Sequence, residues 1–332
     1  MKLRFPACFE DFHCIAAACP DSCCKEWDVL VDDASAQTYQ AMAGDLGDAL
    51  RRHLYQEDER WYFAIEDGRC PMWRQDGLCR IQAEVDHDAL CKTCREFPRL
   101  THDYGDFIEY GLELSCPEVA RMLFAGADTR WVEQEIPGGE EAEYDALDMQ
   151  ILLQTRKQML KILSDTARPL PETLALALLY GYQAQDQLDG GEAQPFDAEA
   201  ELHFGRSAAK PGDLEAVVDF YRHLEILTDA WKHRLNTPAY PTQWDARLRI
   251  LIRYGVERYW LQAISDFDLV SRVKMILLSA ILVHALGGDT VETAQLYAKE
   301  IENNADNVDA ILDGAYTCPA FTDDKLLGLL LL

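Results

Sequence analysis

The chain has 332 residues, 48% hydrophobic and 27% charged, a composition typical of a folded protein long enough for two domains. Its 31 Lys and Arg residues stand against 58 Asp and Glu, a formal net charge of −27. So acidic a surface repels phosphate backbones and anionic lipids, which excludes non-specific nucleic-acid binding and disfavours membrane surfaces. A cationic partner, such as a lysine-bearing protein, is electrostatically allowed.

We expect a cytoplasmic protein with no membrane insertion. The start, Met1 to Pro6, lacks the continuous apolar core of a signal peptide. The longest apolar run, from Met275 to Leu286, contains His284 and falls short of the roughly 18 uninterrupted apolar residues of a membrane span.

The first third of the sequence predicts short elements between loops and turns. A helix is expected over 36–56 from apolar residues three to four apart, and a strand over 61–65. Turn residues predict a small hairpin or knuckle between Cys70 and Cys79. Further along we expect a helical turn or two in 81–90, a strand over 107–114, and a helix over 117–124 that begins at a proline.

Residues 126–142, rich in Gly and Glu, are the expected boundary. Beyond them amphipathic patterns predict helices at about 143–166, 171–188, 212–235, 243–265, 267–286 and 290–313, with a loop over 189–211. We expect Asp213 to begin a helix and Gly287-Gly288 to end one. The predicted fold is mainly α: a small cysteine-rich, cluster-binding domain with short strands (1–125), a linker (126–142) and an all-helical domain (143–332).

Cysteines dominate the first third of the chain. Ten of the eleven lie in the first 116 residues: Cys8, Cys14, Cys19, Cys23, Cys24, Cys70, Cys79, Cys91, Cys94 and Cys116. Cytosolic thiols are kept reduced, so such crowding indicates metal binding or catalysis more than a disulfide framework. Thiolates are soft ligands that suit iron–sulfur clusters and zinc.

The spacing leaves the ligand set open. Only Cys91 and Cys94 form a Cys-x2-Cys pair, and the consecutive Cys23 and Cys24 point apart, so one of these two would ligate while the other packs or serves elsewhere. With Cys8 and Cys318 set aside, nine thiols exceed one four-ligand site. Either two metal centres exist, or one centre and several buried thiols.

The preferred metal ligands are six cysteines with three in reserve. The six are Cys19, Cys23, Cys70, Cys79, Cys91 and Cys94; the reserve is Cys14, Cys24 and Cys116. Histidine is a possible additional ligand, at His13, His87 or His102.

Four segments of residues 1–125 carry many matching positions besides their cysteines. They are Asp11-Phe12-His13-Cys14 with Cys19-Pro20-Asp21-Ser22-Cys23-Cys24-Lys25-Glu26-Trp27-Asp28-Val29-Leu30-Val31-Asp32; Gly68-Arg69-Cys70-Pro71-Met72-Trp73 with Asp76-Gly77-Leu78-Cys79-Arg80-Ile81; Leu90-Cys91-Lys92-Thr93-Cys94-Arg95-Glu96-Phe97-Pro98-Arg99; and Leu114-Ser115-Cys116-Pro117-Glu118-Val119-Ala120-Arg121. In these segments the chain resembles the flagellin lysine-N-methylase family. It departs from the pattern at Met72-Trp73, where Phe-Leu is usual, and in having Cys8.

The resemblance implies methylation of lysine amines on flagellin, with S-adenosylmethionine as donor and an iron–sulfur cluster, of the 4Fe–4S type, on the N-terminal cysteines. Zinc is the alternative metal. From the residues alone, no Gly-rich strand–loop–helix unit for the donor is found. Either a cluster with an open iron position binds the donor, or a closed cluster lies beside a donor pocket in the helical domain.

Methyl transfer needs a neutral lysine amine, hence desolvation or a nearby base. Tyr104, Glu109 and Tyr110, with Glu113, are candidates because they lie between the cysteine sets. The alternative function is a non-catalytic iron–sulfur or zinc protein that serves as a redox sensor or interaction module.

Overall fold

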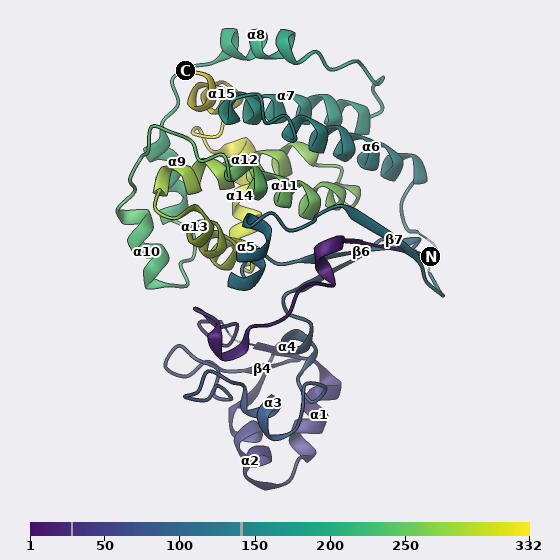
Figure 1. Cartoon of the computed structure of the whole chain (residues 1–332), viewed down its shortest axis with the longest axis vertical. Coiled ribbons are helices and arrows are strands. Elements are labelled where there is room, and N and C mark those ends of the chain that lie inside the picture. The colour runs from purple at the N-terminus through teal and green to yellow at the C-terminus, as the bar shows by residue number, and fades with distance from the viewer. Residues whose placement is uncertain (28, 140–141) are drawn as a thin grey trace. The chain divides into compact units, whose positions relative to one another are not determined.

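The computed structural model describes residues 1–27, 29–139 and 142–332 (Figure 1). Asp28 of the family-like segment and residues 140–141 of the predicted linker lie outside the described residues. The chain divides into two compact units. The cysteine-rich unit comprises Leu3–Asp103 and Ile108–Gln134, and the helical unit comprises Met1–Lys2, Tyr104–Phe107 and Glu135–Leu332.

A three-stranded sheet in the order β2-β4-β3 forms one part of the cysteine-rich unit. The strands are β2 (Val29–Val31), β3 (Leu54–Glu57) and β4 (Arg60–Phe63), and both pairings are antiparallel. The β3–β4 hairpin turns at Asp58 and Glu59, both at positive φ, as its tight right-handed twist requires. The predicted strand over 61–65 is confirmed as β4, whereas β2 and β3 were missed.

Two helices, α1 (Asp33–Ala41) and α2 (Gly44–His53), connect β2 to β3. The prediction of one helix over 36–56 is wrong in its continuity, because the chain is extended at Met42 and Ala43. A Cβ on Gly47 would lie 2.0 Å from the carbonyl oxygen of Met42, so this glycine permits α2 to fold back against the end of α1.

The second sheet has four strands in the order β5-β6-β1-β7. They are β1 (Lys2–Pro6), β5 (Arg99–Asp103), β6 (Phe107–Leu112) and β7 (Trp131–Glu135). The predicted strand over 107–114 is confirmed as β6, and the predicted helix at 117–124 is α5 (Pro117–Phe124), with Pro117 in its first turn. β7 lies inside the predicted linker, where sequence patterning did not indicate a strand. Two short helices, α3 (Arg80–Glu84) and α4 (Lys92–Glu96), complete the unit.

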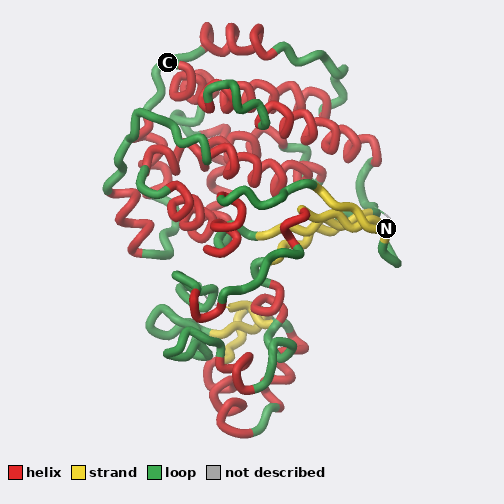
Figure 2. The backbone as a smooth tube through the Cα atoms, viewed as in Figure 1, coloured by secondary structure: helices red, strands yellow, loops and turns green. Residues whose placement is uncertain are grey.

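After β7 the described chain consists of helices joined by loops, with no further strand among the described residues (Figure 2). They are α6 (Ala146–Leu163), α7 (Leu170–Leu188), α8 (Ala198–Ala208), α9 (Leu214–Arg222), α10 (Asp229–Asn236), α11 (Leu248–Tyr259), α12 (Leu269–Leu286), α13 (Thr290–Tyr297), α14 (Ala305–Thr317) and α15 (Asp323–Leu331). A π-helical turn, Ala298–Glu302, follows directly after α13 and precedes α14. The predicted helical character of this region is therefore confirmed for the described residues.

Helix α12 forms the centre of the helical unit, and all of its residues are buried. By length and hydropathy alone it is the one helix among the described residues that could cross a membrane. It packs instead against α7, α9, α11, α13 and α14, as the core helix of a folded protein does. Gly287 at φ +68° ends it at the predicted position.

Three predicted elements of this unit are corrected. The helix over 212–235 divides into α9 and α10, and Thr228 caps the second through its side-chain oxygen. The helix over 290–313 divides at the π-helical turn, after which Asn304 caps α14. The loop predicted over 189–211 contains α8, which Asp197 caps and which buries only two residues, too few for a clear periodic pattern. Asp213 does cap α9, as predicted.

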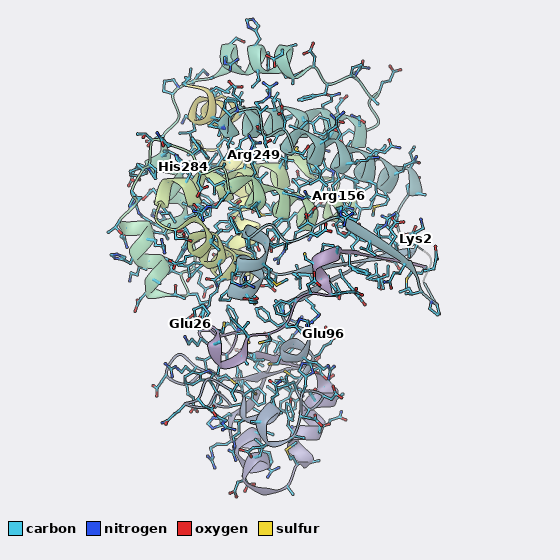
Figure 3. All side chains as sticks on the ribbon, viewed as in Figure 1. Lys2, Glu26, Glu96, Arg156, Arg249 and His284 are labelled. Carbon is cyan, nitrogen blue, oxygen red and sulfur yellow. The ribbon has the colours of Figure 1, made fainter. Side chains whose placement is uncertain are left out.

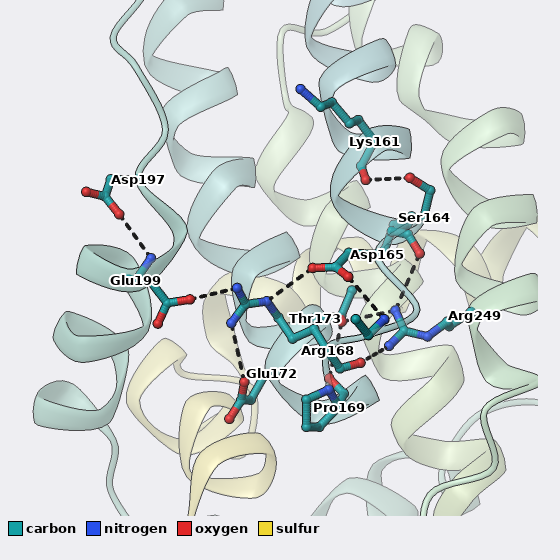
Figure 4. A network of polar contacts seen from close by, with 12 residues as sticks. Lys161, Ser164, Asp165, Arg168, Pro169, Glu172, Thr173, Asp197, Glu199 and Arg249 are labelled. Carbon is teal, nitrogen blue, oxygen red and sulfur yellow. Dashed lines mark hydrogen bonds and ion pairs between the residues drawn. The ribbon is translucent and has the colours of Figure 1, made fainter.

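Two cations, the half-buried Arg249 and the buried Lys274, bind helix ends to one another. Arg249 of α11 donates to the Leu163 carbonyl at 3.4 Å, to Thr173 Oγ1 at 3.0 Å and to the Arg168 carbonyl, and thereby fixes the α6–α7 connection (Figure 4). Burial lowers the pKa of Arg249. Figure 3 marks Arg249 and His284 within the helical unit. Lys274 of α12, 4% exposed, donates to the carbonyls of Ala315 and Phe321 at 3.0 and 3.2 Å.

Candidate metal centre

Five cysteines gather in one hydrophobic core of the cysteine-rich unit. We call Cys24, Cys70, Cys79, Cys91 and Cys94 the core thiol group; all five pack in the cluster that also contains Val31, Tyr39 and Phe63. Cys70 and Cys91 are themselves buried, and the other three are half-buried.

Backbone pairing brings the first three of these thiols together. The N–H of Cys70 donates to the carbonyl of Cys24 at 2.7 Å, next to a β-bridge between Lys25 and Arg69. The predicted knuckle between Cys70 and Cys79 is present as a tight loop, closed by a β-bridge between Trp73 and Cys79. The loops that carry Cys24 and Cys70, which are far apart in the sequence, are thus held side by side.

Asp32 positions the Cys-x2-Cys pair. Cys91 is the N-cap residue of α4 and Cys94 lies in its first turn. The carboxylate of Asp32 accepts from the N–H of Lys92 at 2.8 Å and from the N–H of Ser35 at 3.0 Å. One side chain therefore caps α1 and fixes the start of α4, so the two helices that flank the core thiols keep a set spacing.

Four of the six remaining thiols form a second group, on the segment from Cys14 to Cys23 and at the start of α5. We call Cys14, Cys19, Cys23 and Cys116 the loop thiol group. Cys116 is buried at the N-cap of α5 and packs with Phe12, two residues before Cys14. The Sγ of Cys14 accepts from the N–H of Ala16 at 3.4 Å within the short 3-10 turn between Cys14 and Cys19. Cys14 and Cys23 are exposed to solvent.

The thiols of each group perturb one another's protonation. Burial raises the pKa of Cys70 to about 12, to which the negative charges of Cys24, Cys79 and Cys91 add. Burial likewise raises the pKa of Cys116 to about 11, with Cys19 and Cys14 adding to the rise. Each group is thus a set of neighbouring sulfurs whose negative charges oppose one another's ionisation, with the cations Lys25 near Cys19 and Arg95 near Cys91 acting in the opposite direction.

Two hydrogen-bonded pairs occur inside this arrangement. The Cys23 thiol donates to Cys24 and lowers the pKa of Cys24 to about 7, while the same contact together with burial raises the pKa of Cys23. Cys94 lowers the pKa of Cys91 in the same way, and the pKa of Cys94 is raised well above its usual value. A thiolate in each pair is therefore stabilised beside a protonated partner.

The donor set fits a thiophilic metal or an iron–sulfur cluster in its chemistry. Nine neighbouring sulfurs supply soft ligands, and all eleven cysteines, every one in a described part of the chain, are free thiols. Among the described residues, no three His, Cys, Asp or Glu side chains converge closely enough to hold a metal ion as they stand. Binding would therefore draw the sulfurs together, which the irregular segments around Cys14, Cys23 and Cys70 permit.

The structure sorts the predicted ligands into these two groups. Of the six preferred cysteines, Cys70, Cys79, Cys91 and Cys94 lie in the core thiol group, and Cys19 and Cys23 lie in the loop thiol group. The reserve residue Cys24 lies with the core thiols. Spacing along the chain did not reveal this division, since the contacts between Cys24 and Cys70 and between Phe12 and Cys116 are long-range. The assignment of ligands stays a prediction.

The three histidines considered as additional ligands lie on separate segments of the cysteine-rich unit. The Nδ1 of His13 is 2.9 Å from the Asp11 carbonyl oxygen. His87 is exposed, with Nδ1 3.9 Å from an Asp88 carboxylate oxygen, and His102 lies on β5.

The candidate bases Tyr104, Glu109 and Tyr110 have different surroundings. Glu109, 3% exposed on β6, lies 3.8 Å from the Arg4 guanidinium. Its neighbour Tyr110 stacks on Phe9 at 5.2 Å, and successive strand residues point to opposite faces. Tyr104 stacks on Phe107 in the turn before β6. Glu113 accepts from Ser115 Oγ at 2.6 Å. A catalytic role for these residues stays a prediction.

A pocket in the helical unit lies between α11, α12 and the π-helical turn. Its cavity volume of about 10 Å³ is at most that of one water molecule, far below the volumes of small-molecule sites. Tyr254, Tyr259 and Tyr297 line it with apolar residues. Its carboxylate, Glu302, is already bound by Arg258 at 2.9 Å and Tyr254 at 2.8 Å.

Known proteins similar to this chain come from Salmonella. Flagellar biosynthetic protein FliU of Salmonella muenchen is 32% identical over 134 residues, which cover 37% of this chain and 77% of FliU. The lysine-N-methylases of Salmonella choleraesuis and Salmonella typhimurium are each 31% identical over 130 residues, again 37% of this chain but only 32% of their own length. No family model matches the sequence, and no solved structure matches the fold. The extent and identity of the FliU match establish that the chain belongs to the family of FliU and the lysine-N-methylases.

Proposed function

We propose that the protein is a lysine N-methyltransferase that methylates flagellin, or another lysine-bearing protein, in the cytoplasm with S-adenosylmethionine as methyl donor. The observation that carries the proposal is the similarity to two lysine-N-methylases together with a flagellar biosynthetic protein. The net charge of −27 favours a cationic, lysine-bearing substrate.

The proposal includes an iron–sulfur cluster of the 4Fe–4S type, for which zinc is the alternative. The core thiol group would hold it, because five sulfurs share one hydrophobic core and Asp32 fixes the position of the Cys91–Cys94 pair. When bound, a cluster supplies redox-active iron and cross-links the loops that carry the sulfurs. The chain's own residues would bind and orient the cluster. The β-bridges between Lys25 and Arg69 and between Trp73 and Cys79 hold in place the segments that carry Cys24, Cys70 and Cys79.

The test is a methyl-transfer assay with the whole chain. Anaerobically purified protein, loaded with iron and sulfide, is incubated with purified flagellin and S-adenosylmethionine that carries an isotopically labelled methyl group. Mass spectrometry is expected to find labelled methyl-lysine in flagellin, and none when the chain or the donor is omitted. A metal-loaded, folded protein that leaves flagellin unmodified would contradict the proposed activity.

A second function is favoured by one observation, the absence of a usual donor-binding fold from the described residues. Neither sheet alternates strands with long helices, as the doubly wound fold of common methyltransferases does. The chain also covers only 32% of the lysine-N-methylases it matches. The alternative is a non-catalytic metal protein that acts as a redox sensor or interaction module. Measurable binding of S-adenosylmethionine by calorimetry would argue against it.

A further inference from the structure

Three exposed aromatic side chains of the helical unit lie around the first turns of α12. Tyr182 of α7, Phe267 in the turn before α12 and Tyr316 of α14 are 39%, 47% and 62% exposed, and we call them the aromatic surface. The hydroxyl of Tyr316 donates to Asp268, the N-cap of α12, at 2.6 Å, and that of Tyr182 donates to Asp323 at 2.8 Å. Exposed aromatic side chains that gather in one place are typical of interaction surfaces.

A buried lysine connects the two tyrosines. Lys274 of α12 donates to the carbonyl of Ala315, the residue before Tyr316, at 3.0 Å. The same ammonium group lies 2.8 Å from the Asp323 carboxylate, which accepts from Tyr182. The two tyrosines therefore belong to one region, formed where α7, α12, α14 and α15 pack together (Figure 1).

A glutamine connects the third aromatic residue to the same region. The side chain of Gln185 on α7 donates to the Phe267 carbonyl at 2.8 Å and accepts from the N–H of Leu269 at 2.7 Å. Gln185 lies three residues after Tyr182, so the two side chains are neighbours on their helix. The aromatic surface is thus held by hydrogen bonds on both sides of the start of α12.

The backbone of Phe267 indicates that its side chain is kept for a reason other than folding. Its φ is +59°, in the left-handed region that bulky residues rarely adopt and that glycine adopts without cost. Its N–H donates to the Ala263 carbonyl at 2.8 Å, which fixes the turn. A phenylalanine at this position has an unfavourable backbone conformation and leaves its ring half exposed, so neither the turn nor the core accounts for it.

The charges around the aromatic surface favour a cationic partner. Two buried cations, Arg272 and Lys274, pair with carboxylates there, at 2.8 Å in each case. Four carboxylates stand against these two cations, which leaves the region acidic: Asp189, Asp266, Asp268 and Asp323.

The hydrogen bonds at the start of α12 disfavour an anion. A helix N-terminus binds anions through N–H groups that lack acceptors. Here the N–H groups of Leu269 and Val270 donate to the Gln185 side chain at 2.7 and 3.3 Å. The N–H of Ser271 donates to the Asp268 carboxylate at 3.1 Å. A phosphate or carboxylate would have to displace these acceptors beside an acidic region.

We propose that the aromatic surface is a docking site for a lysine-bearing segment of another protein. Lysine ammonium groups would lie against the exposed aromatic rings, where cation–π attraction acts, and the neighbouring carboxylates would attract them. The partner is the protein that the chain methylates, so its identity rests on the proposed function. Docking itself carries no step of methyl transfer.

Binding of purified flagellin to the full chain tests the proposal, by calorimetry without methyl donor. The test variant is F267G/Y316A. The matched control is F204A, because Phe204 is an equally exposed phenylalanine that lies on α8, outside these contacts. We expect F267G/Y316A to raise the Kd roughly 5- to 25-fold, since each exposed cation–π contact contributes about two- to fivefold. F204A should bind as the native chain does, and added salt should weaken native binding.

Thermal unfolding of F267G separates docking from folding. Glycine relieves the positive φ, so F267G should unfold at the native temperature or above it while it binds flagellin more weakly. A clear fall in the unfolding temperature would mean that Phe267 serves the fold. Flagellin with acetylated lysines should lose most of its binding to the native chain, because acetylation removes the charge.

Equal binding by native chain and F267G/Y316A, equal weakening in F204A, or undiminished binding of acetylated flagellin would each overturn the docking site. So would a native chain that binds neither flagellin nor polylysine. Binding of polylysine alone, weakened in F267G/Y316A, would support the site and count against flagellin as the partner. A chain that binds flagellin through this surface but does not methylate it would count against the proposed activity alone.

Discussion

Replacing Asp32 with alanine is expected to loosen the Cys91–Cys94 pair without touching a sulfur atom. The carboxylate accepts from the N–H groups of Ser35 and Lys92, at 3.0 and 2.8 Å, and these belong to the first turns of α1 and α4. Loss of the α1 cap costs about 1 kcal/mol. Loss of the charged hydrogen bond to the N–H of Lys92 costs about 1.5–3 kcal/mol, for a total of about 2.5–4 kcal/mol.

Hydrogen exchange measures this loss locally. The amides at the starts of α1 and α4 are expected to exchange about 60- to 700-fold faster in D32A, since about 1.4 kcal/mol corresponds to a factor of ten. Metal should also leave D32A faster in competition with a chelator. The matched control is D33A, because the neighbouring Asp33 is exposed in the same first turn. D32N keeps a capping oxygen and should fall between the two. Equal exchange and equal metal loss in D32A and D33A would refute the positioning role of Asp32.

Three further predictions concern the helical unit. K274M removes the buried donor to two backbone carbonyls and should lower the free energy of unfolding by about 2–4 kcal/mol in urea titrations, whereas exposed K232M should change it little. Burial opposes the charge of Asp245, but the hydrogen bonds from the Arg247 guanidinium, the Thr290 hydroxyl and the Arg247 N–H, with the charge of Arg247, together outweigh burial and lower the pKa of Asp245 to about 2. The stability of the native chain over D245N should therefore be about 2 kcal/mol at pH 7 and shrink as the pH falls from about 4 to 2; a difference that grows in acid would contradict this. G181A should lower the melting temperature, because its new methyl group would lie 2.9 Å from a valine of α12, and overpacking of about 1–3 kcal/mol exceeds the gain in helix propensity.

Local signals predicted many single elements correctly. Pro117 begins α5, Asp213 caps α9 and Gly287 ends α12, because each acts on the backbone within a few residues of itself. Elements with few buried residues were missed, among them α8 and the short strand β2. The long predicted helices were broken where capping side chains such as Thr228 and Asn304 begin a new helix.

The sequence by itself determines the number of thiols and their crowding in the first 116 residues. These two properties predict soft-metal chemistry. Which sulfurs lie together was decided only by the tertiary structure. Cys24 lies beside Cys70 through a backbone hydrogen bond, and Cys116 lies near Cys14 through packing on Phe12. Spacing along the chain carries no record of such contacts, because they arise when sheets and helices from distant segments bury their apolar faces together.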